Sequence, residues 1–161
     1  MNMVYFAELI FAAIAWLGVL FVVKPTRIKE LWPCGILGAA VVFETWLLLQ
    51  GLHLSWFKDG FLPIAGVPIG QLLWGAAAGI FVAALLPLEF GGKIFIAIIS
   101  TLLSSGFGYL SEHITRDHVH SRYFSDTENM VLDFIMLSLF IWFAEGLFHN
   151  RIHQKEAISD Q

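Results

Sequence analysis

Four acidic residues stand inside or beside long apolar stretches of the sequence, where a charged group is costly. They are Glu8, Glu44, Asp133 and Glu145. A carboxylate at the centre of a bilayer costs about 2.5–3.5 kcal/mol on insertion scales, so such groups usually face a bundle interior or a water-filled cavity. No lysine or arginine within these stretches can pair with them. The pattern favours either a path for protons or cations, or acids that hydrogen-bond across helices to Ser, Thr or Trp side chains.

Glu44 is the most deeply placed of these acids. It lies eleven residues after Pro33, which is about 16 Å along a helix, close to halfway through a hydrocarbon core of roughly 30 Å. Glu8 and Asp133 lie near one end of their stretches, and Glu145 lies near the other. We therefore expect Glu44 to matter most for function.

A second group of residues has the side chains that bind metal ions. Glu112, His113, His118 and His120 lie close together in the sequence, and histidine and carboxylate are ligands of zinc. Their spacing matches no known ligand motif, so a solvated loop beside helix ends is the simpler interpretation. A haem between His53 and His113 is another alternative, but neither histidine lies well inside an apolar stretch. We expect no cofactor.

The composition is that of a membrane protein. Of 161 residues, 58% are hydrophobic and only 14% are charged, whereas about a quarter of residues are charged in soluble domains. The chain reads as one membrane domain over residues 1–161, with its first apolar run retained as a helix. Nine basic residues argue against a nucleic-acid partner, and the single Cys34 excludes an intrachain disulfide.

The apolar runs predict an all-α bundle of five membrane-spanning helices, over residues 3–23, 33–54, 67–88, 93–111 and 129–149. We expect Lys24-Pro25 to end the first helix and Pro33 to open the second. Asp126 or Thr127 is expected to cap the fifth.

The distribution of basic residues predicts the orientation. With the N-terminus outside, the cytoplasmic side holds Lys24, Arg27, Lys29, Lys93, Arg151 and Lys155, and the outer side holds Lys58, Arg116 and Arg122. Six against three favours an outer N-terminus and a cytoplasmic C-terminus. We expect a multi-pass protein of the cell membrane, in a bacterium the cytoplasmic membrane.

Small residues indicate where helices approach closely. Gly75 and Gly79 form a GxxxG pattern, and Ser104 and Gly108 repeat the spacing in the next helix. Such spacing lets two backbones come close together. We expect the third and fourth helices to pack against each other within the chain.

Two family resemblances follow from short motifs. The chain resembles uncharacterised small multi-spanning membrane proteins of Gram-positive, often spore-forming, bacteria. The features that carry this resemblance are Lys24-Pro25, Trp32-Pro33, Pro63, Pro68, Pro87 and Glu112. It implies a membrane location and no particular activity.

The second resemblance covers about 45 residues. Phe43-Glu44-Thr45-Trp46 followed by residues 66–73 is similar to the lycopene cyclase domain of carotenoid synthesis. That family has a pair of glutamates where this chain has Gly70 and Gln71. Protonation of an alkene needs a positioned acid, so the resemblance implies shared helical architecture rather than cyclase activity, unless Glu44 alone serves.

These features lead to one expected function and two alternatives. The short loops and the lack of a specific motif favour a non-catalytic subunit or scaffold that assembles with the lipid bilayer, other membrane proteins or itself. A protein that handles protons or cations through Glu44, Glu8 and Asp133 is the first alternative. An enzyme that modifies a lipid or isoprenoid is the second.

Overall fold

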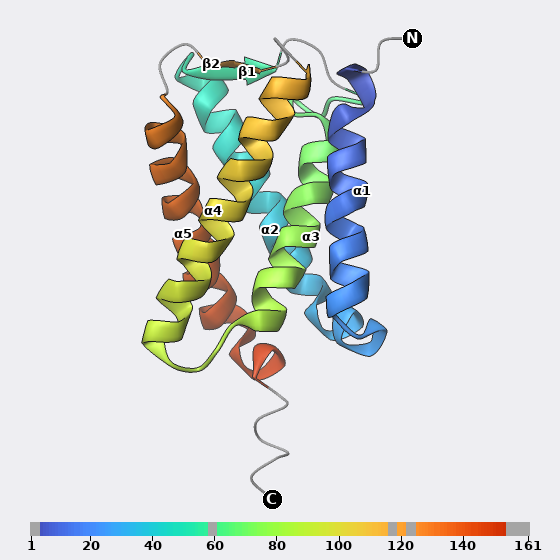
Figure 1. The fold of residues 1–161 in the computed structure, drawn as a ribbon. Helices are drawn as coiled ribbons and strands as arrows, with labels where there is room; N and C mark the ends of the chain where they lie inside the picture. Colours follow the sequence, from blue (N-terminus) through green and yellow to red (C-terminus); the bar gives the residue numbers. More distant parts are fainter. Residues whose placement is uncertain (1–3, 58–60, 116–118, 122–124, 154–161) are drawn as a thin grey trace, which may run out of the picture.

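The computed structural model describes residues 4–57, 61–115, 119–121 and 125–153. Within these residues the chain forms five helices and two short strands (Figure 1): α1 (Val4–Val22), α2 (Pro25–Gly51), β1 (Ser55–Phe57), α3 (Ile69–Leu85), α4 (Phe90–Thr115), β2 (Val119–Ser121) and α5 (Asp126–Ile152). The predicted helical class is confirmed. Three of the helices, α2, α4 and α5, are long and apolar enough to cross a membrane, whereas α1 and α3 are shorter apolar helices.

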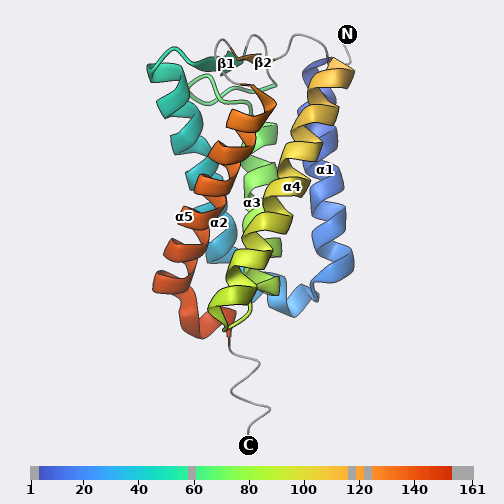
Figure 2. The ribbon, with the colours of Figure 1, turned by 60° about the vertical axis from the view of Figure 1, so that its left-hand side comes forward.

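The five helices run alternately up and down, so that helices adjacent in the sequence are antiparallel. We call the end that holds Gly51 and Ile69 the upper end, and the end that holds Pro25 and Ile152 the lower end. Figures 1 and 2 show α1 beginning at the upper end and α5 finishing at the lower end. The first and last helices therefore place their outer termini on opposite ends of the bundle.

The closest helix contact joins α2 to α3 through glycines on both sides. A Cβ atom on Gly38 would overlap the carbonyl oxygen of Gly75, and one on Gly79 would lie 2.5 Å from the carbonyl oxygen of Cys34. The expected pairing of Gly75 and Gly79 with the fourth helix is therefore wrong. α3 makes few contacts with α4, and a Cβ atom on Gly108 would meet open space among the described residues.

The second helix begins eight residues earlier than the sequence predicts. Pro25 occupies its first turn, and Pro33 lies inside the helix. A proline in a helix interior removes one backbone hydrogen bond and crowds the preceding turn. Here Leu31 and Cys34, on either side of Pro33, are fully buried, so packing against the bundle holds the helix together across the proline.

Two further helix starts differ from the prediction. α4 begins at Phe90 and not at Lys93. The cap of α5 is Ser125, whose hydroxyl accepts a hydrogen bond from the backbone N–H of Glu128, while the Glu128 carboxylate accepts one from the Ser125 backbone N–H. This reciprocal arrangement is a capping box, so the prediction that Asp126 or Thr127 caps the helix is wrong.

The core lies inside the bundle and includes Ala97 of α4, and the outside of the bundle is apolar. Side chains that are almost fully buried include Val19, Leu31, Ile80 and Ala144. Large apolar side chains also cover the outer face of α4 and α5, including Phe95, Ile98, Leu102, Leu103, Ile135, Leu139 and Trp142. An apolar exterior of this extent matches a hydrocarbon environment.

A small antiparallel pairing closes the upper end. β1 pairs with β2, with Trp56 opposite His120. It ties the α2–α3 connection to the α4–α5 connection (Figure 1). The sequence predicts loops here, because three-residue strands leave little periodic pattern to detect.

Candidate functional site

Glu44 faces away from the bundle. Its side chain is exposed, and no hydrogen bond or ion pair to it forms within the described part of the chain. Its neighbour Thr45 turns its hydroxyl back to its own helix and donates to the carbonyl oxygen of Val41, 2.8 Å away. The Glu44 carboxyl group is therefore available to a molecule outside the bundle.

Between Leu31 and Gln50, the exposed residues of α2 recur at every fourth position and form one row. The row consists of Trp32, Ile36, Ala40, Glu44 and Leu48, and we call it the Glu44 ridge. The large apolar members are strongly exposed, at 52% for Trp32, 56% for Ile36 and 62% for Leu48. Rows with this spacing are the ridges that pack into the grooves of another helix.

Glu44 lies closer to the upper end than its distance from Pro33 predicts. It is seven residues before Gly51, the last residue of α2, and Asp133 is seven residues after Asp126, the first residue of α5. At 1.5 Å per residue, both lie about 10 Å inside the upper helix ends. Glu44 therefore shares its depth with Asp133, although the two side chains differ in their surroundings.

Glu8 lies at the contact between α1 and α3. Only 6% of it is exposed, and the Gln71 side chain lies within hydrogen-bonding reach of its carboxyl group. A Cβ atom on Gly70 would lie 2.7 Å from the Cβ atom of Glu8, so only glycine fits at that position. Gly70 and Gln71 of α3 thus pack against an acid supplied by α1.

Asp133 lies between α4 and α5. The Ser105 hydroxyl donates a hydrogen bond of 3.1 Å to its Oδ2 atom. Asp133 also borders a cavity of about 40 Å³, which is lined by residues of α2, α3, α4 and α5, among them Gly38, Trp74, Ser104 and Phe140. A water molecule fits in a space of this size, but a substrate with an isoprenoid chain does not.

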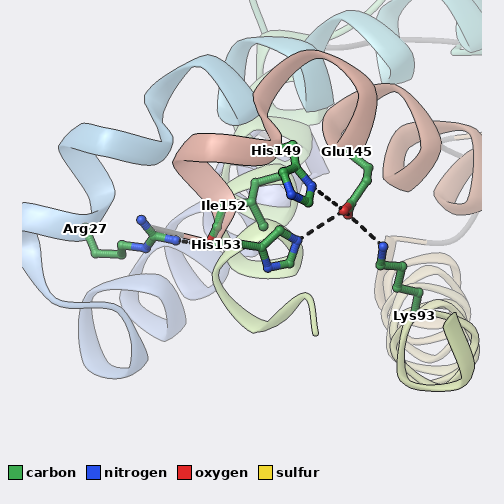
Figure 3. A network of polar contacts seen from close by, with 6 residues as sticks. All are labelled: Arg27, Lys93, Glu145, His149, Ile152 and His153. Carbon is green, nitrogen blue, oxygen red and sulfur yellow. Dashed lines mark hydrogen bonds and ion pairs between the residues drawn. The ribbon is translucent and has the colours of Figure 1, made fainter. Parts of the chain in front are cut away.

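The densest group of polar contacts surrounds Glu145 at the lower end (Figure 3). Its Oε1 atom lies 2.8 Å from Nδ1 of His149, 3.2 Å from Nε2 of His153 and 3.0 Å from Nζ of Lys93. The Oε2 atom is buried and has no partner among the described residues. Glu145, which the sequence presents as one of several intramembrane acids, is thus the centre of a network that joins α5 to the start of α4.

Arg27 holds the end of α5 in place beside this network. Its buried guanidinium donates hydrogen bonds to the backbone carbonyl oxygens of Arg151 and Ile152, and Figure 3 shows the one to Ile152. It also pairs with Glu30 at 2.9 Å. The last carbonyl groups of a helix lack partners within the helix. Here the buried guanidinium of Arg27 in α2 donates hydrogen bonds to these carbonyl groups. Its positive charge also interacts favourably with the partial negative charge at a helix C-terminus.

The predicted outer metal ligands are Glu112, His113, His118 and His120. His118 lies outside the described residues. For Glu112 and His113 at the end of α4, and for His120 in β2, the structure describes the backbone alone. The grouping of these four residues stays a prediction.

The structure brings together residues that the sequence analysis keeps apart. Glu8, Glu44 and Asp133 have separate surroundings: a helix contact, the outer surface and the α4–α5 contact. Glu145, His149 and His153 converge instead. Their regular spacing of four residues was a signal of one helix face, but the predicted fifth helix ends at residue 149 and leaves His153 in the tail.

Comparison of the chain with protein-family models, curated proteins and solved structures gives no match. The two family resemblances drawn from short motifs stay predictions.

Proposed function

We propose that the chain is a non-catalytic subunit of a membrane assembly, and that it binds a transmembrane helix of another membrane protein along the Glu44 ridge. In this proposal all five helices cross the bilayer, with the N-terminus outside and the lower end in the cytoplasm. The observation that carries the proposal is an exposed carboxyl group on an apolar ridge, with no partner among the residues that the structure describes.

The dimensions of the bundle support five crossings. α1 has 19 residues and α3 has 17, which correspond to about 28 Å and 26 Å, near the roughly 30 Å of a hydrocarbon core. Both run beside the three longer helices over most of their height (Figure 1). Five crossings place the two termini on opposite sides of the membrane.

The charges at the lower end support the orientation. Basic residues among the described residues of that end are Lys24, Arg27, Lys29, Lys93 and Arg151. Cytoplasmic loops of membrane proteins carry an excess of lysine and arginine. The lower end therefore fits the cytoplasmic side.

The Glu44 ridge needs a protein partner because lipid chains offer neither a cation nor a hydrogen-bond donor to the Glu44 carboxyl group. Glu44 lies about 10 Å inside the helix end, where a carboxylate facing lipid costs up to about 2.5–3.5 kcal/mol. A neighbouring helix that offers a cation or a hydrogen-bond donor removes much of this cost. Ala40, one turn away on the ridge, has a small side chain and lets such a helix approach closely.

A different protein fits this position better than a second copy. The lysines and arginines among the described residues lie at helix ends or in connections, so the described part of a second copy brings no cation to the depth of Glu44. Two copies that met along their ridges would instead place two acids near each other. Charge complementarity therefore favours a partner with a basic or hydrogen-bond-donating residue inside one of its spans.

The alternative functions have less support. Transfer of protons through Glu44, Glu8 and Asp133 requires a connected path, whereas these residues lie in separate surroundings. Modification of an isoprenoid or lipid requires a pocket of several hundred Å³, and the cavity beside Asp133 is about 40 Å³.

Purification in mild detergent from the source membrane tests the proposal. We expect the wild-type chain to elute with one partner in a fixed ratio, and the Glu44→Leu variant to bind this partner about five- to thirtyfold more weakly, as for the loss of 1–2 kcal/mol from an interhelical hydrogen bond. Glu44→Gln keeps a hydrogen-bonding group, so its affinity for the partner should lie between those of the wild type and Glu44→Leu. The sequence of the partner should show a basic or donor residue within an apolar span.

The control variant is Ile135→Ala, which changes an exposed side chain of α5. It should retain the partner. The thermal stability of the separated chain should be the same for wild type and Glu44→Leu, because Glu44 has no partner within the described chain. A Glu44→Leu variant that keeps its partner at full strength, or a wild-type chain that elutes alone or only as a dimer of itself, contradicts the proposal.

A further inference from the structure

The last two turns of α5 bend so that residues distant along the helix meet. Glu145 and His153 are eight residues apart, a separation of about 12 Å along a straight helix. Their side-chain atoms are nevertheless 3.2 Å apart. The backbone of Phe148 between them departs from helical geometry, with φ −129° and ψ 21°, and His153 forms the C-cap.

This bend is held from outside the helix. The hydrogen bonds from Arg27 to the carbonyl oxygens of Arg151 and Ile152 fix the final turn, and the one to Ile152 is drawn in Figure 3. The His153 side chain is only 7% exposed. The convergence of His153 on Glu145 is therefore part of the packed structure, and it differs from a chance contact between mobile surface side chains.

The converging atoms are ligands for a metal ion. One carboxylate oxygen of Glu145, Nδ1 of His149 and Nε2 of His153 all lie within 4.8 Å of one another. Tetrahedral zinc bonds of about 2.0–2.1 Å place ligand atoms about 3.4 Å apart. The two contacts to Glu145, at 2.8 Å and 3.2 Å, are near that separation, and the two histidine nitrogens lie within 4.8 Å of each other.

Lys93 neutralises the charge of Glu145 in this structure, as a bound metal ion would. Its ammonium group lies 3.0 Å from the same Oε1 atom, and its side chain is 20% exposed. The second oxygen of Glu145 is buried without a partner among the described residues, so this oxygen can still bind an ion or accept a hydrogen bond. A flexible lysine at the start of a helix can move away when a dication arrives.

We propose that Glu145, His149 and His153 form a binding site for a divalent transition-metal ion, and that Lys93 competes with the ion for Glu145. Two histidines and one carboxylate form a ligand set typical of zinc, with a fourth position left for water. The site lies at the lower end of α5, far along the chain from the outer histidines. It is independent of the proposed role of the Glu44 ridge.

Metal titration of the full chain in detergent tests the proposal. After treatment with a chelator, we expect the wild type to bind one Zn²⁺ with these ligands, and Co²⁺ to give a visible absorption band from the same site. His149→Gln and His153→Gln should each weaken binding at least about tenfold, since even residues that only support a ligand contribute that much. His149 is exposed, so its variant should fold normally.

Lys93→Gln is the distinguishing variant. Removal of the competing ammonium should tighten Zn²⁺ binding about two- to fivefold, the range expected for release of a partly exposed ion pair. His53→Gln, and a variant with His113, His118 and His120 all changed to Gln, serve as controls and should bind as the wild type does.

The opposite results overturn the site. If the His149→Gln, His153→Gln double variant binds Zn²⁺ as tightly as the wild type, the ion binds elsewhere. If Lys93→Gln weakens binding, Lys93 does not compete for Glu145. A wild-type chain that takes up no Zn²⁺ or Co²⁺ also contradicts the proposal.

Discussion

The guanidinium group of Arg27 donates a hydrogen bond to the backbone carbonyl oxygen of Ile152, a residue 125 positions later in the chain. This contact joins the first turn of α2 to the last turn of α5. It also ties the C-terminal end of the described helical bundle to α2 at the lower end (Figure 3).

Replacement of Arg27 by Met should destabilise the chain. The change leaves the carbonyl oxygens of Arg151 and Ile152 without their donor, and hydrogen bonds to charged groups contribute about 1.5–3 kcal/mol. We expect the free energy of unfolding to fall by about 2–3 kcal/mol, measured by thermal or denaturant unfolding in detergent. The control is Lys29→Gln, an exposed change in the same turn region; equal stability of the two variants would show that Arg27 does not fix α5.

Replacement of Gly38 by Ala should push α2 away from α3. The new methyl group would overlap the carbonyl oxygen of Gly75, and overpacking of this kind costs about 1–3 kcal/mol. Gly108→Ala is a matched control, because a Cβ atom there meets open space among the described residues and alanine favours a helix by up to about 1 kcal/mol. The free energy of unfolding should therefore fall for Gly38→Ala and rise for Gly108→Ala. A Gly38→Ala chain that is more stable than the wild type would refute the close contact.

The sequence predicts the helices well because long apolar runs carry the signal. It does not predict the start of α2, because Pro25 and Pro33 both suit a first helical turn. Only the tertiary packing of Leu31 and Cys34, which are fully buried, explains why the helix continues through Pro33. Local preference at a proline is outweighed here by burial.

The sequence also does not show whether the Glu44 side chain faces into or out of the bundle. α2 is apolar on every side, with Cys34 facing inward and Ile36 and Leu48 facing outward, so residue type does not separate its faces. The close-packing glycines Gly35 and Gly38 were the available signal, since small residues mark a helix interface. The row that contains Glu44 lies away from them.

The Glu145 network depends on contacts that no local pattern shows. Lys93 comes from another helix, and Arg27 acts from a third. The departure of Phe148 from helical geometry, which brings His153 back to Glu145, leaves no mark in the residue types around it. The spacing of Glu145 and His149 predicts a shared helix face, but the contribution of His153 requires the folded chain.

The binding of a partner helix along the Glu44 ridge can be mapped by photo-crosslinking in the native membrane. A photoreactive amino acid is placed in turn at Ile36, Ala40 and Leu48 on the ridge, and at Leu103 of α4 and Leu139 of α5 as exposed controls. Each adduct is identified by its mass and sequence.

We predict that the three ridge positions give an adduct with the same membrane protein, that the two controls do not, and that Glu44→Leu in the same chain reduces its yield. Adducts with lipid alone, adducts between two copies of this chain, or equal yields from the ridge and the controls would contradict the account.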